Sequence, residues 1–593
     1  MQGMVGCYEK RRDQNGTSSS KEVLGEMLSV FAEDKVSNVE THSFGRFSLA
    51  IFSNSRTPFS FRPEYIKIQN KHIFFDGFLR DKQEFLSILN GPTKLSIPES
   101  IINLSGQYNI VIFDESTDEL VLVNDRHGSR YLYYYNDQGS FVFAPNPKVI
   151  LSTRLIKDKE LDYQAIISLL SHEYIIGDRS LVKGVKLLPH ASYVKLTAHD
   201  QKITRYWNFN SLSSEKHSGN YDKLIETGIS LTKKAIESFA LDDAEIIIPL
   251  SGGMDSRTIS CFLSNKANIK AIHMDYSFEK KLAAKIAGRL EIDLEIRPLE
   301  STLAWEKIDP FIACASNSLH QFWLYPHLKN KIDQGFGTLI VDGYLMNEVI
   351  GGLSTLKMGD YSQINQMFPP LNPAFDFILG PKIRDFYHEN HDFQVAKIVS
   401  NCPINEAYEK YLYFTILNYG RRFTLLMSTI HQYLSAVGLP VLDYDLMDFC
   451  LRLPMNFKKN SRFYRDIVCS AFPEVVDIPW SRNRLPLNSD KNRHLMYSYI
   501  DKIKKAKYYL SRITHARIEY PARHDKNRWF RKDKDYRDYF MNLIFDDRTF
   551  DKGYVSKAGL EKIVCLIDTG RNYFDILEKV ALIEIVSREL GVG

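Results

Sequence analysis

The alternation of apolar and polar positions divides the chain into two parts of different character. In the first 210 residues, short β-branched and aromatic runs recur between polar or Gly-containing turns: FSLAIF, YIKIQ, HIFFDGFL, YNIVIFD, ELVLVND, RYLYYY, SFVFA and YVKLTA. Such runs predict strands, and their spacing is typical of layered antiparallel sheets. Residues 162–171 (DYQAIISLLS) differ, because their apolar positions fall at helical spacing and predict a helix.

From about residue 221 the segments lengthen and helices alternate with short apolar runs. We expect strands at 244–250, 269–274, 294–298 and 338–341, with a helix at 279–290. Strands that alternate with helices indicate a parallel α/β sheet. From about residue 407 onward the pattern is mainly helical. We therefore divide the chain into domains 1–209 and 210–593.

Composition narrows the class of protein. The 593 residues are too many for one core, and a net charge of +4 excludes a globally basic nucleic-acid binder. No apolar run is long enough for membrane insertion, and the first residues lack the apolar core of a signal peptide. The seven cysteines are odd in number and show no CxxC spacing. These features favour a cytoplasmic enzyme.

One segment of the chain carries an excess of basic residues. Residues 501–537 hold 13 Lys or Arg against five Asp or Glu, interleaved with aromatic residues. A solvated helical face accounts for this pattern, and a docking surface for an acidic partner is the alternative.

The strongest chemical signal is residues 246–256, IIIPLSGGMDS, an apolar strand that runs into a double-glycine loop and then a helix. Glycines let a backbone approach a ligand closely, and the unpaired N–H groups of a helix start attract anions. No Gly-Lys-Ser/Thr follows, so this is not a Walker A loop, and G-x-G-x-x-G is absent. The pattern predicts a phosphate site at Leu250, Ser251, Gly252, Gly253, Asp255 and Ser256.

The SGGxDS pattern resembles the pyrophosphate-binding loop of ATP pyrophosphatases, in which Asp255 matches the Mg²⁺-binding aspartate. Other segments resemble the asparagine synthetase-like family: MQGMVG, LSGQYNIVIFDESTDELVLVNDRHGSRYLYY, VKLLPHASYVKL…RYWNF and GLPVLDYDLMDFCLRLP. The resemblance implies an α/β protein with Ntn-hydrolase-like antiparallel sheets, followed by a parallel ATP-pyrophosphatase domain with a helical extension. It also implies ATP and Mg²⁺ as cofactors and adds Met274 and Gly343 to the nucleotide-binding residues.

The front half departs from that family at its glutaminase site. The family's nucleophile is a cysteine directly after the initiator methionine, where this chain has Gln2. A carboxamide is no thiolate nucleophile, and Cys7 lies five residues further on. The family's Asn-Gly oxyanion pair is here Asp76-Gly77, and a carboxylate would repel a developing oxyanion. We expect an inactive glutaminase domain.

The second motif of the family, SGEGxDExFGG, aligns with residues 342–352, DGYLMNEVIGG. Glu348 matches, whereas Asn347 replaces the second metal-binding aspartate and can offer only a carbonyl oxygen. Tyr344 replaces the catalytic glutamate. β-Lactam synthetases also carry tyrosine there, paired with a downstream carboxylate, for which Asp376, Asp385 and Glu389 stay open. A packing role for Tyr344 is the alternative.

The family's transition-state lysine has no counterpart in residues 473–487, PEVVDIPWSRNRLPL. Arg482 and Arg484 lie in its region, and either guanidinium could bind a phosphate, although surface charge is the alternative. The predicted catalytic residues are therefore Tyr344, Glu348, Arg482 and Arg484, and the predicted metal ligands are Asp255 and Asn347.

These residues lead us to expect an ATP- and Mg²⁺-dependent amide synthetase that works without glutamine hydrolysis. Ring closure of the macrolactam or β-lactam type and amidation of a surface-glycan acid are the reactions considered. An ammonia-dependent asparagine synthetase and a non-catalytic scaffold are the alternatives. The expected partners are a small-molecule or peptide carboxylate and pathway proteins, with no nucleic acid and no membrane insertion.

Overall fold

The computed structural model describes most of the chain. The described residues are 2–10, 19–31, 38–54, 57–90, 103–209, 216–266, 268–275, 279–298, 309–317, 319, 338–352, 374–390, 402, 407–489, 503 and 526–592. The basic stretch predicted at 501–537 lies outside them up to residue 525, apart from Ile503.

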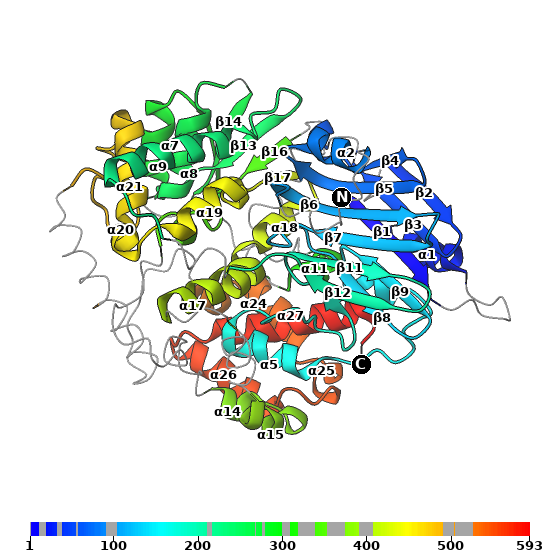
Figure 1. Cartoon of the computed structure of the whole chain (residues 1–593). Helices are drawn as coiled ribbons and strands as arrows, with labels where there is room; N and C mark the ends of the chain where they lie inside the picture. The colour runs from blue at the N-terminus through cyan, green and yellow to red at the C-terminus, as the bar shows by residue number, and fades with distance from the viewer. Residues whose placement is uncertain are drawn as a thin grey trace.

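Two six-stranded antiparallel sheets form the first part (Figure 1). The first has the order β10-β8-β9-β1-β3-β2, with β1 Gly3–Glu9, β2 Asn38–Phe44, β3 Phe47–Ser53, β8 Tyr133–Asn136, β9 Ser140–Ala144 and β10 Lys186–Leu187. The second has the order β12-β11-β7-β6-β5-β4, with β4 Glu64–Ile68, β5 Lys71–Leu79, β6 Gly106–Asp114, β7 Glu119–Asn124, β11 Ser192–Leu196 and β12 Gln201–Arg205. Side chains of both sheets, among them Phe47 and Phe74, share one buried cluster, so the sheets are layered.

Four helices accompany these sheets. They are α1 Ser20–Leu28, α2 Lys82–Asn90, α4 Pro147–Leu151 and α5 Tyr163–His172. Helix α5 begins where the sequence predicts it, because the side chain of its N-cap residue Asp162 accepts a hydrogen bond from the Ala165 N–H at 3.1 Å.

A five-stranded parallel sheet forms the second part, in the order β15-β14-β13-β16-β17. Its strands are β13 Glu245–Pro249, β14 Ile269–Asp275, β15 Asp293–Pro298, β16 Thr338–Val341 and β17 Ala436–Gly438. The helices α7 Tyr221–Glu237, α8 Met254–Leu263 and α9 Glu279–Arg289 belong to this part. The predicted fold class is confirmed, and the sequence pattern missed only β17 in this sheet, which is three residues long.

The remaining helices form the extension that the pattern predicts. They are α11 Pro310–Ser316, α13 Met346–Val349, α14 Phe375–Ile378, α15 Pro381–Asn390, α17 Ala407–Phe414, the π-helix η4 Thr415–Thr424, α18 Leu426–Gln432, α19 Tyr444–Arg452, α20 Met455–Lys458, α21 Arg462–Ala471, α23 Lys526–Lys532, α24 Lys534–Ile544, α25 Asp547–Asp551, α26 Lys557–Asp568 and α27 Phe574–Leu590.

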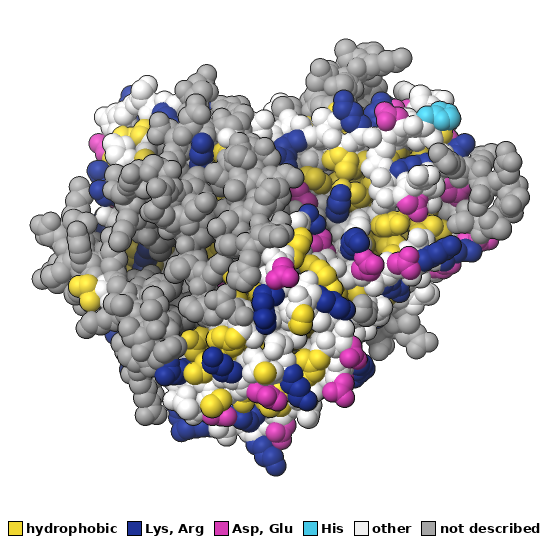
Figure 2. Space-filling model, turned by 90° about the horizontal axis from the view of Figure 1, so that it is seen from below, with side chains coloured by type: hydrophobic (Ala, Val, Ile, Leu, Met, Phe, Trp, Pro, Cys, Tyr) yellow, Lys and Arg dark blue, Asp and Glu magenta, His cyan; other side chains and the backbone are white. Residues whose placement is uncertain are grey.

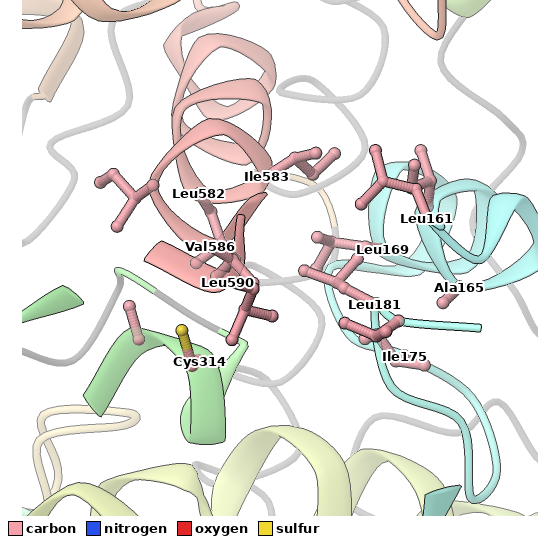
Figure 3. Close-up of a cluster of buried hydrophobic side chains, with 14 of the residues drawn as sticks. Leu161, Ala165, Leu169, Ile175, Leu181, Cys314, Leu582, Ile583, Val586 and Leu590 are labelled. Atoms are coloured by element: carbon pink, nitrogen blue, oxygen red, sulfur yellow. The ribbon is translucent and has the colours of Figure 1, made fainter. Parts of the chain in front are cut away.

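The helical extension shares its core with the first part of the chain. Figure 3 shows Leu582, Val586 and Leu590 of α27 facing Leu169 of α5 and Cys314 of α11, all within one cluster of buried side chains. Hydrogen bonds join the same elements, because the Lys579 ammonium of α27 donates to the carbonyl oxygen of Leu170 at 2.9 Å. The two ends of the chain are therefore packed together.

Surface and cysteine features agree with the composition. Figure 2 shows basic and acidic side chains interspersed over the described part of one face.

All seven cysteines are free thiols. Among the described residues, no helix combines the length and the apolar character that a membrane span requires.

Candidate nucleotide site and a small cavity beside Gln2

The candidate nucleotide site lies where the parallel sheet changes direction. The chain passes from β13 outward to β14 and β15, and β16 then pairs with the other side of β13 (Figure 1). The loops after β13 and β16 therefore start side by side at the carboxyl edge of the sheet and then run in opposite directions. In open α/β sheets this switch point is where ligands bind.

The loop after β13 is built around Gly252 and Gly253. The Leu250 N–H still bonds to the Ile272 carbonyl oxygen at 2.9 Å, and the Gly253 N–H donates to Ser251 Oγ at 3.0 Å. Ser256 Oγ accepts from the Ser251 N–H at 3.0 Å and ties the loop to α8. Helix α8 begins after Gly253 without a side-chain cap, so its first N–H groups can serve an anion.

Packing explains why the loop needs glycine. A Cβ at Gly252 would lie 2.6 Å from Leu282 Cδ1, and one at Gly343 would lie 2.5 Å from Asp255 Cβ. Gly343 therefore lets the loop after β16 lie directly against α8. Met274, near the carboxyl end of β14, is buried in the core beneath this loop.

Three acidic residues, Asp255, Asp342 and Glu348, lie on the two segments that follow β13 and β16 at the switch point, where two of them act on the pKa of the third. Removal from water, the charge of Glu348 and the charge of Asp342 raise the pKa of Asp255 to about 8, whereas a hydrogen bond from Tyr464 and the charge of Arg482 lower it. Burial also raises the pKa of Asp342 to about 7 and that of Glu348. Asp255 Oδ1 is buried and has no hydrogen-bond partner within the described ranges. These carboxylates need a positive partner.

Arg482 is held beside these groups by its loop. The Ser481 N–H donates to the Gly252 carbonyl oxygen at 2.9 Å. The buried Arg257 of α8 donates to the carbonyl oxygens of Ile478 at 2.9 Å and Pro479 at 2.8 Å. The charge of Arg482 lowers the pKa of both Asp255 and Glu348, so the three charges lie within electrostatic range of one another.

Arg484 has a backbone role in the same loop. Its N–H donates to the Trp480 carbonyl oxygen at 2.7 Å with φ at 60°, which closes the turn that carries Arg482. The structure therefore brings Arg482 near the acidic groups. The part that it establishes for Arg484 is the backbone hydrogen bond that closes this turn.

The loop after β16 carries the second predicted motif. The backbone N–H groups of Gly343 and Tyr344 partly offset the rise in the pKa of Asp342, and the Asp342 N–H donates to the Gly438 carbonyl oxygen at 3.0 Å, which fixes the start of the loop. The Tyr344 side chain is half-buried and packs against the core of the sheet. Asn347 Oδ1 accepts a long hydrogen bond from Ser461 Oγ, at 3.5 Å.

Of the three carboxylates left open as partners of Tyr344, only Asp385 has a described side chain. Asp385 is exposed on α15, and Figure 1 places that helix at the far end of the molecule from β16. The side chains of Asp376 and Glu389 lie outside the described residues.

A small cavity lies where the first sheet meets α18. It is lined by Gln2, Asp76, Arg130, Tyr131, Pro145, Thr429, Gln432 and Tyr433. Arg130 binds Asp76 through two hydrogen bonds, Nε to Oδ2 at 2.9 Å and Nη2 to Oδ1 at 2.6 Å. Gln2 is 5% exposed, and neither polar atom of its carboxamide has a partner among the residues that the structure describes.

This cavity holds neither a thiol nor an open oxyanion site. Cys7 lies on β1 but is buried in the core, and burial and nearby acidic groups raise the pKa of its thiol far above the usual range. A Cβ at Gly77 would clash with the Gln107 carbonyl oxygen, so the backbone at Asp76 is fixed.

Sequence reasoning missed several residues of these two sites: Asp342, Tyr464, Arg257 and Arg130. Asp342 stands inside the second motif directly after a predicted strand, Arg130 stands inside one of the quoted family-like segments, and Arg257 directly follows the double-glycine motif. What no local pattern encodes is their partners, which come from distant segments.

Comparisons with known proteins support the resemblance. The family described as glutamine amidotransferase domain matches residues 95–207. Asparagine synthetase [glutamine-hydrolyzing] 3 of Bacillus subtilis is 26% identical over 194 residues, 31% of this chain and 30% of the relative. Putative asparagine synthetase [glutamine-hydrolyzing] 2 of Methanocaldococcus jannaschii is 23% identical over 304 residues, 49% of this chain and 57% of the relative.

A third relative, asparagine synthetase [glutamine-hydrolyzing] 2 of Bacillus subtilis, is 24% identical over 280 residues, 43% of this chain and 37% of the relative. The matched segments thus span about a third to just over a half of these relatives. Over the matched segments, the chain is similar to proteins of the asparagine synthetase-like family.

Proposed function

We propose that the protein is an ATP- and Mg²⁺-dependent amide synthetase that does not use glutamine. The observation that carries this proposal is the double-glycine loop at the switch point, with the buried and unpartnered Asp255 Oδ1 beside it. In the proposed reaction a substrate carboxylate attacks the α-phosphorus of ATP and releases pyrophosphate. An amine then attacks the acyl-adenylate and releases AMP.

Each residue of the site has a role in this proposal. Ser251, Gly252 and Gly253 and the start of α8 bind the pyrophosphate group, because they offer N–H groups, hydroxyls and space without side chains. Arg482 neutralises charge on the transferring phosphate. Glu348 adds negative charge within electrostatic range of Arg482 and Asp255. Tyr344 stands at the loop start, where its phenol would relay a proton from the amine by passing its own proton to a base.

The donor set fits a magnesium ion. Asp255 would hold it through the oxygen that lacks a protein partner, as hard cations require. Mg²⁺ offsets the charge of the polyphosphate when bound. Because no three metal-capable side chains gather within the described part of the chain, ATP itself must supply further oxygens.

The proposal excludes glutamine as nitrogen source because of the front cavity. Gln2 offers no nucleophile, and the Asp76 carboxylate is locked to Arg130. Nitrogen then arrives as free ammonia or as an amine on a substrate. We infer a specialised acceptor, with macrolactam or β-lactam ring closure and amidation of a glycan acid as the reactions to test.

The test is pyrophosphate release from ATP in the presence of panels of acids and amines. We expect release that depends on an acid and on Mg²⁺, that is lost in Asp255→Ala, and that is kept in Asp385→Ala, the matched aspartate on distant α15. Glutamine as sole nitrogen source should support no amide formation. Failure of ATP to bind would favour a non-catalytic scaffold instead.

The names of the relatives favour a second candidate, an ammonia-dependent asparagine synthetase. Aspartate with ammonium chloride is therefore one arm of the panel. Asparagine and AMP formed in equal amounts would identify this candidate, and their absence with release from other acids would favour the specialised synthetase.

A further inference from the structure

We propose that Asp342, at the end of β16, is the second carboxylate that binds the divalent cation, in the place that the sequence motif gives to Asn347. This inference rests on the proposed function, because the cation is the one that accompanies ATP. It assigns a metal ligand that neither the motif nor the relatives indicate.

The first step of the argument is the register of the sheet. Ile247 of β13 pairs with Ile340 of β16, so Pro249 and Asp342 stand at the same level two residues further on. The Asp342 N–H donates to the Gly438 carbonyl oxygen at 3.0 Å and continues the ladder to β17. Asp342 is therefore fixed at the carboxyl edge, where the double-glycine loop begins.

The second step places Asp342 next to Asp255. The residue that follows, Gly343, has no room for a Cβ because Asp255 Cβ would lie 2.5 Å from it. Two carboxylates on adjacent segments, one of them with a buried oxygen that lacks a partner among the described residues, are a donor set for a hard cation that completes its shell with phosphate and water oxygens.

The third step concerns Asn347. Asn347 and Glu348 are consecutive residues of the four-residue helix α13, so their side chains leave the helix about 100° apart. Asn347 Oδ1 accepts a hydrogen bond from Ser461 Oγ at 3.5 Å, and a Cβ on Gly351 would lie 3.2 Å from this oxygen, so it already has its neighbours at the far end of α13. The Lys458 ammonium holds this orientation by donating to the Val349 carbonyl oxygen at 3.0 Å. Asn347 is thus a structural link to α21.

The experiment measures Mn²⁺ uptake by the full chain, from the loss of the free-ion electron paramagnetic resonance signal, with α,β-methylene-ATP as the uncleavable nucleotide. We expect Asp342→Asn and Asp342→Ser to raise the Kd for Mn²⁺ at least tenfold, as Asp255→Asn does. Asn347→Ala should change it less than twofold, and Asp385→Asn should not change it. Thermal unfolding identifies which Asp342 variant is folded.

The outcomes separate the two proposals. If wild type binds Mn²⁺ with nucleotide and both Asp342 variants bind it equally well, the Asp342 assignment is wrong and the proposed function stands. If Asn347→Ala loses binding as much as Asp255→Asn, the motif assignment replaces ours. If wild type takes up no Mn²⁺ with nucleotide, the ATP-dependent function fails, and the assignment fails with it.

Discussion

A single ion pair decides the chemistry of the front cavity. Asp76 and Arg130 are each about 4% exposed and are joined by two hydrogen bonds. A buried pair of this kind contributes little when compared with apolar residues, but removal of one partner leaves the other charge buried and unpaired. The pair therefore fixes both side chains and leaves no freedom for oxyanion binding.

We predict that Gln2→Cys creates no glutaminase. A thiol at residue 2 would face a cavity whose carboxylate opposes negative charge on a tetrahedral intermediate. Ammonia release from glutamine measures the result, with circular dichroism as the check of folding. Turnover by this single variant would contradict the role given to Asp76.

Arg130→Ala should lower the free energy of unfolding by about 3–5 kcal/mol, because Asp76 would stay buried without a partner. Chemical denaturation measures the change. Arg154→Ala is the control, since Arg154 pairs with Glu22 and Glu26 at the surface and should alter stability little. Equal effects of the two variants would contradict the prediction.

At the scale of single residues, the sequence predicts one member of each interacting pair but not its partner. Gln2, Asp76, Asp255 and Glu348 stand in motifs, and their chemical types alone imply their behaviour. Their partners cannot be predicted in the same way. Arg130 lies 54 residues from Asp76, so only the pairing of distant strands brings the two together.

Among the elements, helix α8 connects the loops of the candidate nucleotide site. Its buried Arg257 reaches the carbonyl oxygens of the loop that carries Arg482, and the Ser481 N–H returns a hydrogen bond to Gly252. The helix, the double-glycine loop and the arginine loop are thus one hydrogen-bonded unit. A change in Arg257 must move Arg482 without touching the ligand.

We predict that Arg257→Met weakens ATP binding at least tenfold and lowers stability by about 2–4 kcal/mol, because several buried carbonyl oxygens lose their donor. Arg289→Met is the matched control. Arg289 contacts the same loop from the surface, at Asp477 and the Glu474 carbonyl oxygen. Calorimetric titration with ATP and denaturation curves measure the two effects.

Strands could be predicted from the sequence where the run of apolar residues was long enough. The strand predicted at 338–341 has the bounds of β16, and the other predicted strands of this sheet differ from the structure by one or two residues. The three residues of β17, AVG, were not predictable, because so short an apolar run shows no period. The order of the strands also came only from the structure, since local patterns contain no pairing.

The whole molecule buries titratable groups at the contact between its two parts. Burial lowers the pKa of His431 in α18 to about 3, and burial together with Arg126 and Arg421 lowers the pKa of His127 to about 3. Both stay neutral in the fold, whereas an unfolded histidine gains a proton near pH 6.5. Folding stability is therefore lost as pH falls from about 6.5 towards 3.

We predict that each buried histidine removes about 1.4 kcal/mol of stability per pH unit below 6.5. Carboxylates also titrate in this range, so the measurement is the difference between wild type and His431→Leu. That difference should shift in favour of the variant as the pH falls from 7 to 4.5. A difference that does not depend on pH would mean that His431 is protonated in the fold.

The packing of α27 against α5 limits which parts of the chain can be lost. Residues near position 170 cover apolar side chains of α27, so deletion of the first part of the chain would expose buried residues of the second part. Even if the chain makes no use of glutamine, as we propose, loss of the first part would expose these apolar side chains of α27. The first part is therefore also a packing partner of the last helix, and substitutions in its small cavity are limited to those that keep this packing.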